Sequence, residues 1–222
     1  MNKIELEKIK QKALENHIPI IMDDTLKVID KILKELKPNR ILEIGTAVGY
    51  SAICFSEYLQ DGGIIDTIER EHDRVEEAKE NIKKAEVEDK INILFGDAVE
   101  ILPTLNNEYD VVFIDAAKGK YPFFLKEALR MLNEKYDMVF IDAAKGKYPF
   151  FLNQALRMLN DKGIILADNI LYKGYVMSDY NKHKQRTAVR NLREFLQELQ
   201  ENEELEVEIL EVGDGLAISK KI

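Results

Sequence analysis

Residues 40–52 read RILEIGTAVGYSA, and this stretch decides the fold. Arg40 to Ile44 has the near-continuous apolar character of a buried strand, Gly45 and Gly49 punctuate a turn, and a helix is expected from about Tyr50 to Leu59. In α/β sheets, ligands bind beyond the carboxyl ends of the strands, where such turns lie. The stretch therefore predicts both a fold class and a place for a ligand.

The same alternation of strands and helices continues on both sides of this stretch. Two helices precede it, at 3–16 and from an N-cap in the cluster Asp23-Asp24-Thr25 to just before Pro38. Further strands are predicted at 64–68, 91–95, 111–114, 138–141, 163–167, 205–211 and 215–220, and helices at 72–85, near Val99 and at 185–200. This order predicts a doubly wound, Rossmann-like, mostly parallel sheet with an antiparallel strand near the C-terminus. We expect one domain spanning 1–222.

Composition narrows the class of protein. The chain has 222 residues, of which 45% are apolar and 33% charged, with a net charge of −9. That balance is typical of a globular protein and disfavours one that coats nucleic acid. No apolar run reaches the roughly 18 residues of a membrane span, and the charged N-terminus does not resemble a signal peptide. Cys54 is the single cysteine, expected to be an inert core residue, and we predict a cytoplasmic protein.

Residues 109–135 are followed directly by a near copy of themselves at 136–162. The copies differ only at the pairs 111/138, 126/153, 127/154 and 134/161. A solenoid needs at least three repeats, so this is one strand–loop–helix unit duplicated in tandem inside a globular protein. Each copy carries Asp-Ala-Ala-Lys after its strand, so the chain holds two candidates for one site and one extra βα unit.

The glycine turn is the first candidate binding element. Gly45 and Gly49 let the backbone approach a ligand closely, and the helix that begins near Ser51 can hold a carboxylate. The spacing matches neither a dinucleotide fingerprint nor a phosphate-binding P-loop. Alone, the turn is a weak indication of a site.

Acidic residues end three successive strands. Glu43 lies near the end of the first, Glu69 ends the second, and Asp97 with Ala98 follows the third. An acid at the second position can accept hydrogen bonds from ribose hydroxyls, while Asp97 and a neighbouring amide suit adenine. Because acids repel phosphates, this set favours S-adenosylmethionine over NAD or ATP. The alternative is that these are ordinary surface acids.

A third set of residues suits a metal. Asp115, its copy Asp142, and the pair Asp168-Asn169 follow predicted strands and offer hard oxygen ligands, which Mg²⁺ prefers. Such a cation would lower the pKa of a substrate hydroxyl. Three residues beyond each copied aspartate lie the candidate catalytic lysines, Lys118 and Lys145. The alternative is strand-end caps and solvated lysines.

Taken together, the motifs closely resemble those of the metal-dependent class I O-methyltransferases, which include catechol and caffeoyl-CoA O-methyltransferases. The nearest likeness is to the bacterial branch that methylates 5-hydroxyuridine at the tRNA wobble position. It covers the whole chain except one 27-residue copy, which such proteins lack. The motifs that carry it are ILEIGTAVGYSA, Glu69, GDA, YDVVFIDAAKG, GIILADNILYKG and VGDGLAISKK.

The resemblance implies roles for individual residues. It implies contacts to the methionine moiety near Ile21, Gly45 and Ser51, ribose binding by Glu69, adenine binding by Asp97 and Ala98, and metal ligation by a strand-end aspartate with Asp168 and Asn169. The implied activity is Mg²⁺-dependent methylation of a hydroxyl, on tRNA 5-hydroxyuridine or a small hydroxylated aromatic. We also expect a homodimer.

A basic segment between Lys173 and Arg193 stands out in an otherwise acidic chain. From charge alone it is a solvated surface or a face that attracts a polyanion. In the tRNA-modifying branch the corresponding segment faces the anticodon, so the resemblance implies RNA contacts by Lys173, Lys182, Lys184, Arg186 and Arg190.

Two arrangements of the copies are possible. If both strands enter the sheet, Asp115 faces the cofactor side and Asp142 neighbours Asp168 and Asn169. The metal then moves away from the methyl donor by about one strand spacing, ~4.8 Å. If one copy is excluded, Asp115 replaces Asp142 as the ligand and an ordinary site remains. We favour the first arrangement, whose alternative outcome is a cofactor-binding protein with a disrupted metal site, catalytically impaired or only RNA-binding.

Overall fold

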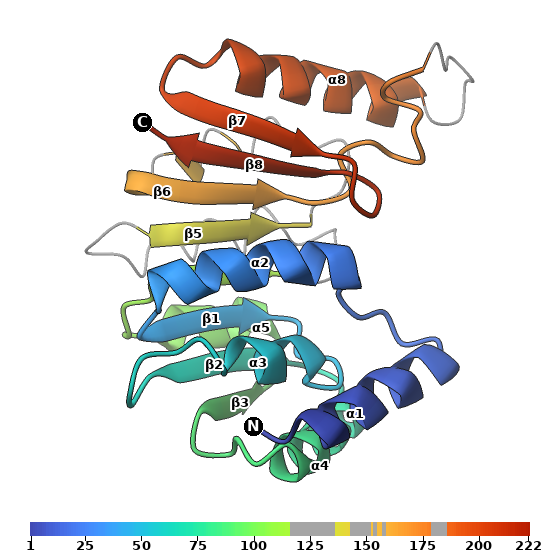
Figure 1. The fold of residues 1–222 in the computed structure, drawn as a ribbon. Coiled ribbons are helices and arrows are strands. Elements are labelled where there is room, and N and C mark those ends of the chain that lie inside the picture. Colours follow the sequence, from blue (N-terminus) through green and yellow to red (C-terminus); the bar gives the residue numbers. More distant parts are fainter. Residues whose placement is uncertain (116–135, 143–151, 153–154, 157–158, 179–185) are drawn as a thin grey trace. The chain divides into compact units, whose positions relative to one another are not determined.

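The computed structural model describes residues 1–115, 136–142, 152, 155–156, 159–178 and 186–222 (Figure 1). In chain order the elements are α1 (Lys3–Glu15), α2 (Asp23–Leu36), β1 (Arg40–Ile44), α3 (Tyr50–Phe55), β2 (Ile64–Glu69), α4 (His72–Lys84), β3 (Ile91–Phe95), α5 (Ala98–Ile101), a 3-10 turn η1 (Leu102–Thr104), β4 (Val111–Ile114), β5 (Tyr136–Ile141), β6 (Leu159–Ala167), α8 (Arg186–Glu201), β7 (Leu205–Leu210) and β8 (Leu216–Lys221).

These residues group into two compact units, Met1–Phe113 and Ile114–Ile222. The expectation of a single domain over 1–222 stays a prediction.

In the first unit the strands are ordered β3-β2-β1-β4. β1 and β2 pair in parallel from Arg40↔Ile64 to Ile44↔Ile68, and β2 continues in parallel with β3 up to Glu69↔Phe95. The core of this unit is apolar, with the rings of Phe55 and Phe113 meeting edge to face at 5.0 Å between centroids. Because parallel strands end at one edge, the segments that follow β1, β2 and β3 leave the sheet together.

The helices of the first unit begin and end for local reasons. α2 starts at Asp23 after Met22, which makes no side-chain cap, so the predicted N-cap in Asp23-Asp24-Thr25 is wrong. Both aspartates lie in the first turn, where the helix dipole favours negative charge. α3 ends at Phe55, before the predicted Leu59.

Cys54 lies on α3 and is 6% exposed, which confirms the expected core position. Burial raises the pKa of its thiol to about 12. The thiol is therefore protonated and chemically quiet in the folded chain.

In the second unit the order is β5-β6-β8-β7. β5 and β6 are parallel, and β8 is antiparallel to both β6 and β7, which confirms the predicted antiparallel strand near the C-terminus. β6 begins at Leu159, four residues before the predicted start, because Leu159 pairs with Tyr136 across an irregularity in the ladder. Helix α8 buries one apolar face, made of Val189, Leu192, Phe195, Leu196 and Leu199.

Both near-identical segments therefore form strands. β4 lies next to β1 in the first unit and β5 next to β6 in the second. Ile114, the last residue of β4, belongs to the second unit, where its carbonyl accepts a hydrogen bond from the Asp142 amide at 3.4 Å. The extra strand is formed, as the in-sheet arrangement predicts, and the α/β, mostly parallel fold class is confirmed.

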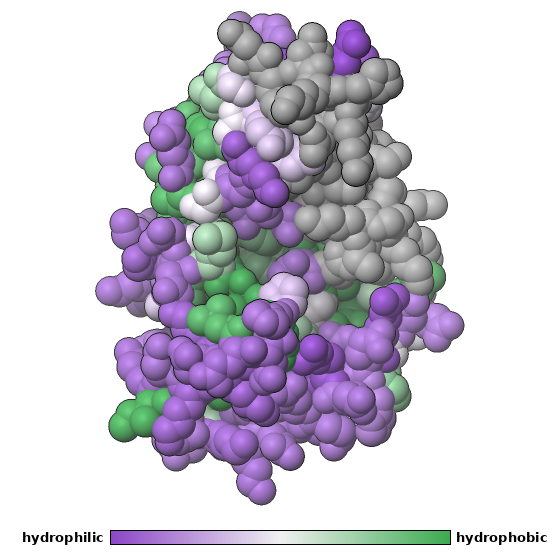
Figure 2. All heavy atoms as spheres, turned by 90° about the vertical axis from the view of Figure 1, so that its right-hand side faces the viewer, coloured by the Kyte–Doolittle hydropathy of each residue, from purple (hydrophilic) through white to green (hydrophobic). Residues whose placement is uncertain are grey.

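Hydrophilic side chains cover much of the described surface in Figure 2. Large apolar side chains that are exposed are few and scattered: Met1, Ile4, Leu14, Met22, Phe95, Met177 and Ile222. Among the described residues, no helix combines the length and apolarity that crossing a membrane requires.

Candidate functional site

The glycine turn after β1 adopts a conformation that its sequence requires. Gly45 and Gly49 have φ of 108° and 80°, and Ala47 between them has φ of 47°, in the left-handed region. The amides of Gly45 and Thr46 both donate to the Ile68 carbonyl, at 3.0 and 3.2 Å. The turn is thus anchored to the end of β2, and its two glycines occupy backbone conformations that strain other residues.

Glu43 lies beneath this turn and is fully buried. Its two carboxylate oxygens accept hydrogen bonds from Ser51 Oγ and Thr67 Oγ1, each at 2.5 Å, and Thr67 in turn lies 2.7 Å from Thr46 Oγ1. A buried carboxylate needs such donors to offset its lost hydration. Glu43 therefore connects β1, β2 and the start of α3. Two predicted cofactor-binding residues, Glu43 and Ser51, are in direct contact.

Glu69, at the end of β2, holds the turn by a side-chain hydrogen bond. One carboxylate oxygen accepts the Ala47 amide at 2.9 Å, and the other accepts the amides of Arg70 and Glu71, also at 2.9 Å. A carboxylate offers about four acceptor positions. Three backbone donors hold Glu69 in place and leave room for a further hydroxyl donor.

The end of β3 brings the adenine candidates to the same edge. The Gly96 amide donates to the Glu69 carbonyl at 2.8 Å. Asp97 caps α5 by accepting the Val99 amide at 3.0 Å, and Ala98 is buried. Ile21 is half-buried in the segment between α1 and α2, and no polar contact links it to this edge within the described residues.

In the second unit the metal candidates cluster at the ends of β5 and β6. Asn169 Nδ2 donates to Asp142 Oδ1 at 3.0 Å, and the Asn169 amide donates to Asp168 Oδ1 at 2.8 Å. Asn169 has φ of 59°, which turns the chain sharply after β6. The Asp168 amide donates to the Ile141 carbonyl at 3.0 Å, which places the two strand ends together.

Crowding of acids perturbs this cluster. Burial raises the pKa of Asp168 to about 6, the Asn169 amide opposes that rise, and the charges of Asp142, Asp115 and Asp214 add to it. Asp115 is exposed, whereas Asp142 is half-buried beside Asn169. Carboxylates whose charges repel one another are the groups that a bound cation stabilises.

Not every predicted site residue can be placed. Lys118 and Lys145 lie outside the described residues, as do Lys182 and Lys184. Within the described ranges, no set of three or more His, Cys, Asp or Glu side chains is arranged to hold a metal ion. Asp142, Asp168 and Asn169 are a different kind of set, two carboxylates and one amide.

The basic segment is only partly available to a partner. Lys173, Arg186 and Arg190 are exposed, although Arg190 forms an ion pair with Glu194 at 3.6 Å. Arg193 donates from Nε to the Val176 carbonyl at 2.9 Å and also bonds the carbonyls of Tyr175 and Ser178. Arg193 therefore ties the segment after β6 to α8 and has a structural role.

Known proteins share this fold and are similar in sequence. The sequence model of the O-methyltransferase family matches residues 5–135 and 131–222, two pieces that overlap at 131–135, next to the junction of the near copies. The chain belongs to the O-methyltransferase family. It is 30% identical over 202 residues to a catechol O-methyltransferase of Niastella koreensis, covering 87% of this chain and 78% of that protein. It is 27% identical over 207 residues to a caffeoyl-CoA O-methyltransferase of Populus kitakamiensis, covering 90% and 77%.

A solved relative adds the cofactor. The O-methyltransferase TomG of Streptomyces achromogenes, in complex with S-adenosylmethionine, superposes with a TM-score of 0.65 at 25% identity, covering 98% of this chain and 89% of that one. The protein is thus an S-adenosylmethionine-dependent O-methyltransferase.

Two buried polar residues of this O-methyltransferase, Thr67 and Asn81, were not predicted from the sequence. Thr67 pairs in register with Glu43, and Asn81 occupies the buried face of α4 beside Val75, Ala78 and Ile82. Each is a polar residue at a position that the apolar pattern assigns to the core. That mismatch was the available signal, because a buried polar side chain needs a partner.

Proposed function

We propose that this O-methyltransferase binds its cofactor at the edge formed by the turn after β1, Glu69 and Asp97, and methylates a hydroxyl with the help of Mg²⁺. The proposal is supported most by Asp142, Asp168 and Asn169, whose oxygens are of the kind that Mg²⁺ prefers. Crowded negative charge, with the pKa of Asp168 raised to about 6, fits a cation at this place.

Each group has a chemical task in this proposal. The cation supplies charge that lowers the pKa of the substrate hydroxyl. S-adenosylmethionine, held by the turn after β1, Glu69 and Asp97, would supply the electrophilic methyl group for the substrate oxygen and leave as S-adenosylhomocysteine. The hydroxyl proton passes to a base, for which the candidates are Lys118 and Lys145. Glu69 orients the ribose while its own carboxylate is held by three backbone amides.

We propose 5-hydroxyuridine in tRNA as the substrate and a small hydroxylated aromatic as the alternative. The exposed cations Lys173, Arg186 and Arg190 support a polyanionic partner, in a chain whose net charge of −9 otherwise repels one. Catechol and caffeoyl-CoA methylation by the curated relatives support the alternative. We also propose a homodimer.

A second candidate follows from the two strands. Both β4 and β5 form strands, where an unduplicated chain would have only one of them. In this candidate the added strand moves the metal ligands away from the methyl donor by about one strand spacing, ~4.8 Å. The protein would then bind the cofactor but transfer methyl groups poorly.

Methyl transfer from labelled cofactor, with and without Mg²⁺, separates these possibilities. Transfer RNA that carries 5-hydroxyuridine is incubated with the protein and its nucleosides are analysed by mass spectrometry, and a catechol is tested in parallel. A cation-dependent methylated 5-hydroxyuridine supports the leading proposal, and methylated catechol alone supports the alternative substrate. Cofactor binding without transfer to either would favour the impaired enzyme.

A further inference from the structure

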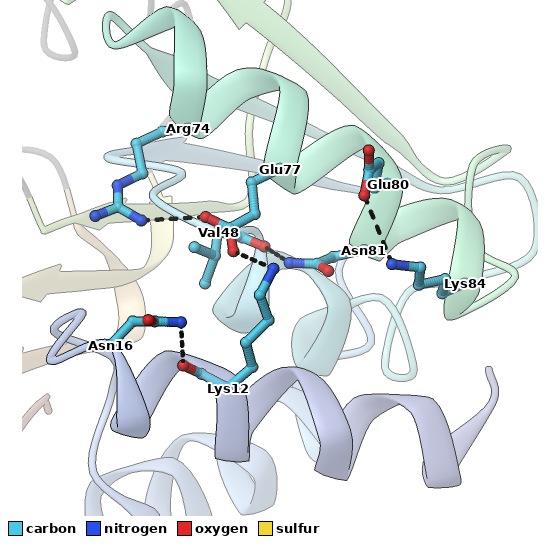
Figure 3. A network of polar contacts seen from close by, with 8 residues as sticks. All are labelled: Lys12, Asn16, Val48, Arg74, Glu77, Glu80, Asn81 and Lys84. Atoms are coloured by element: carbon cyan, nitrogen blue, oxygen red, sulfur yellow. Dashed lines mark hydrogen bonds and ion pairs between the residues drawn. The ribbon is translucent and has the colours of Figure 1, made fainter.

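Helix α4 touches the cofactor turn at two consecutive residues. The Nδ2 of Asn81 donates to the Val48 carbonyl at 2.9 Å, from a side chain that is only 4% exposed (Figure 3). One residue further on, Gly49 lies beside α4, where an added Cβ would be in ordinary van der Waals contact with Ala78 Cβ at 3.4 Å and Ile82 Cγ1 at 3.6 Å. The turn therefore rests on α4 through one side-chain hydrogen bond and one glycine contact.

The other contacts of the turn come from elements already assigned to it. The amides of Gly45 and Thr46 bond the end of β2, and the Ala47 amide bonds Glu69. Val48 is the remaining residue, and the side chain that fixes its carbonyl is Asn81. A left-handed residue such as Ala47, with φ of 47°, keeps its conformation only where its neighbours hold it.

The helix that carries Asn81 is itself braced. Glu77 on α4 forms an ion pair with Lys12 of α1 at 2.8 Å, and a second one within α4 with Arg74 at 3.2 Å (Figure 3). The Asn2 amide, at the start of α1, donates to the Ala85 carbonyl just beyond α4 at 2.9 Å. Two contacts from α1 therefore hold α4, the helix whose Asn81 bonds the turn.

We propose that Asn81 is a positioning residue for the cofactor: by holding the Val48 carbonyl it keeps the turn 45–49 in the conformation that receives S-adenosylmethionine. Its effect passes through the turn and not through contact with the cofactor. The inference rests on the cofactor edge proposed above.

The test compares two variants of the full chain. Asn81→Leu keeps the size of the side chain and removes the donor, while Val75→Ala removes buried methyl groups from the same helix without a bond to the turn. Calorimetry measures the Kd for S-adenosylhomocysteine, and urea unfolding measures stability. Losing a buried hydrogen bond should raise the Kd roughly tenfold in Asn81→Leu. Val75→Ala should leave the Kd within about twofold although it lowers stability.

Kinetics provide a second readout where the chain is active. Asn81→Leu should raise KM for S-adenosylmethionine and leave kcat at saturating cofactor almost unchanged, since the lost energy concerns binding. If Asn81→Leu does not fold, Asn81→Ala replaces it in the same comparison. An unchanged Kd in the folded Asn81 variant, or an equal loss of affinity in Val75→Ala, would overturn the inference. A wild-type chain that binds no S-adenosylhomocysteine would instead overturn the proposed cofactor edge, and this inference with it.

Discussion

At the scale of single residues, the two copied aspartates differ in their surroundings. Asp142 is half-buried and bonded to Asn169, whereas Asp115 is exposed. We expect Asp142→Ala to weaken Mg²⁺ binding at least tenfold, a loss of about 1.4 kcal/mol. The affinity for S-adenosylhomocysteine should stay unchanged. Asp115→Ala is the matched variant, and it should mainly weaken the cofactor. Titration calorimetry with each ligand tests this, and the opposite pattern would make Asp115 the metal ligand.

A second residue-scale prediction concerns Asp30 on α2. Its Oδ1 is buried and has no hydrogen-bond partner within the described residues, and burial raises the pKa of its carboxyl. The folded chain then binds this proton more tightly than the unfolded chain, so stability falls as pH rises through the folded pKa. Asp30→Asn should therefore raise the urea midpoint at pH 7 and change it less near pH 4. A gain that is independent of pH would show that the charge is not the cause.

At the scale of elements, the duplicated unit should have the largest effect on the rate of methyl transfer. Methyl transfer needs reacting atoms about 3–3.5 Å apart, and one strand spacing is about 4.8 Å. Deleting residues 136–162 should restore ordinary spacing and raise the Mg²⁺-dependent rate at least tenfold. A folded deletion variant with an unchanged or lower rate would mean that the full chain already has a working site. Circular dichroism and S-adenosylhomocysteine binding establish that the variant is folded.

The elements also show what the sequence can and cannot predict. β1, β3 and β4 match their predicted bounds because their apolar runs end at charged or glycine residues. The start of β6 could not be predicted because it depends on pairing with Tyr136, which is distant in sequence. The N-cap of α2 was predicted wrongly because aspartates are favoured in the first turn of a helix as well as at its N-cap, and here they lie in the first turn. The strand ends that carry Glu43, Glu69 and Asp97 could be predicted from the apolar runs before them, whereas their roles in binding stay predictions. Asn81 could not be predicted, since its contact depends on where α4 meets the turn.

At the scale of the whole molecule, the charge pattern governs any encounter with RNA. Neutralising Lys182, Lys184 and Arg186 together should weaken tRNA binding and reduce its salt dependence by about 2–3 in log–log slope, because each phosphate contact contributes about 0.7–0.9. The control removes three exposed lysines of α1, α2 and α4, which are Lys8, Lys27 and Lys79. The control should leave the slope unchanged. Equal effects of the two triple variants would mean that only net charge matters.

Cys54 is a natural probe of local unfolding around α3. The chain contains one thiol, that of Cys54, which is buried on α3 directly after the turn 45–49 and has a pKa raised to about 12. A thiol reagent can reach it only when that helix separates from its surroundings, so the labelling rate reports the free energy of a local opening. A ligand that binds at the neighbouring turn should slow the labelling, and the decrease in rate measures how much the ligand stabilises this region against local unfolding. No engineered probe is needed.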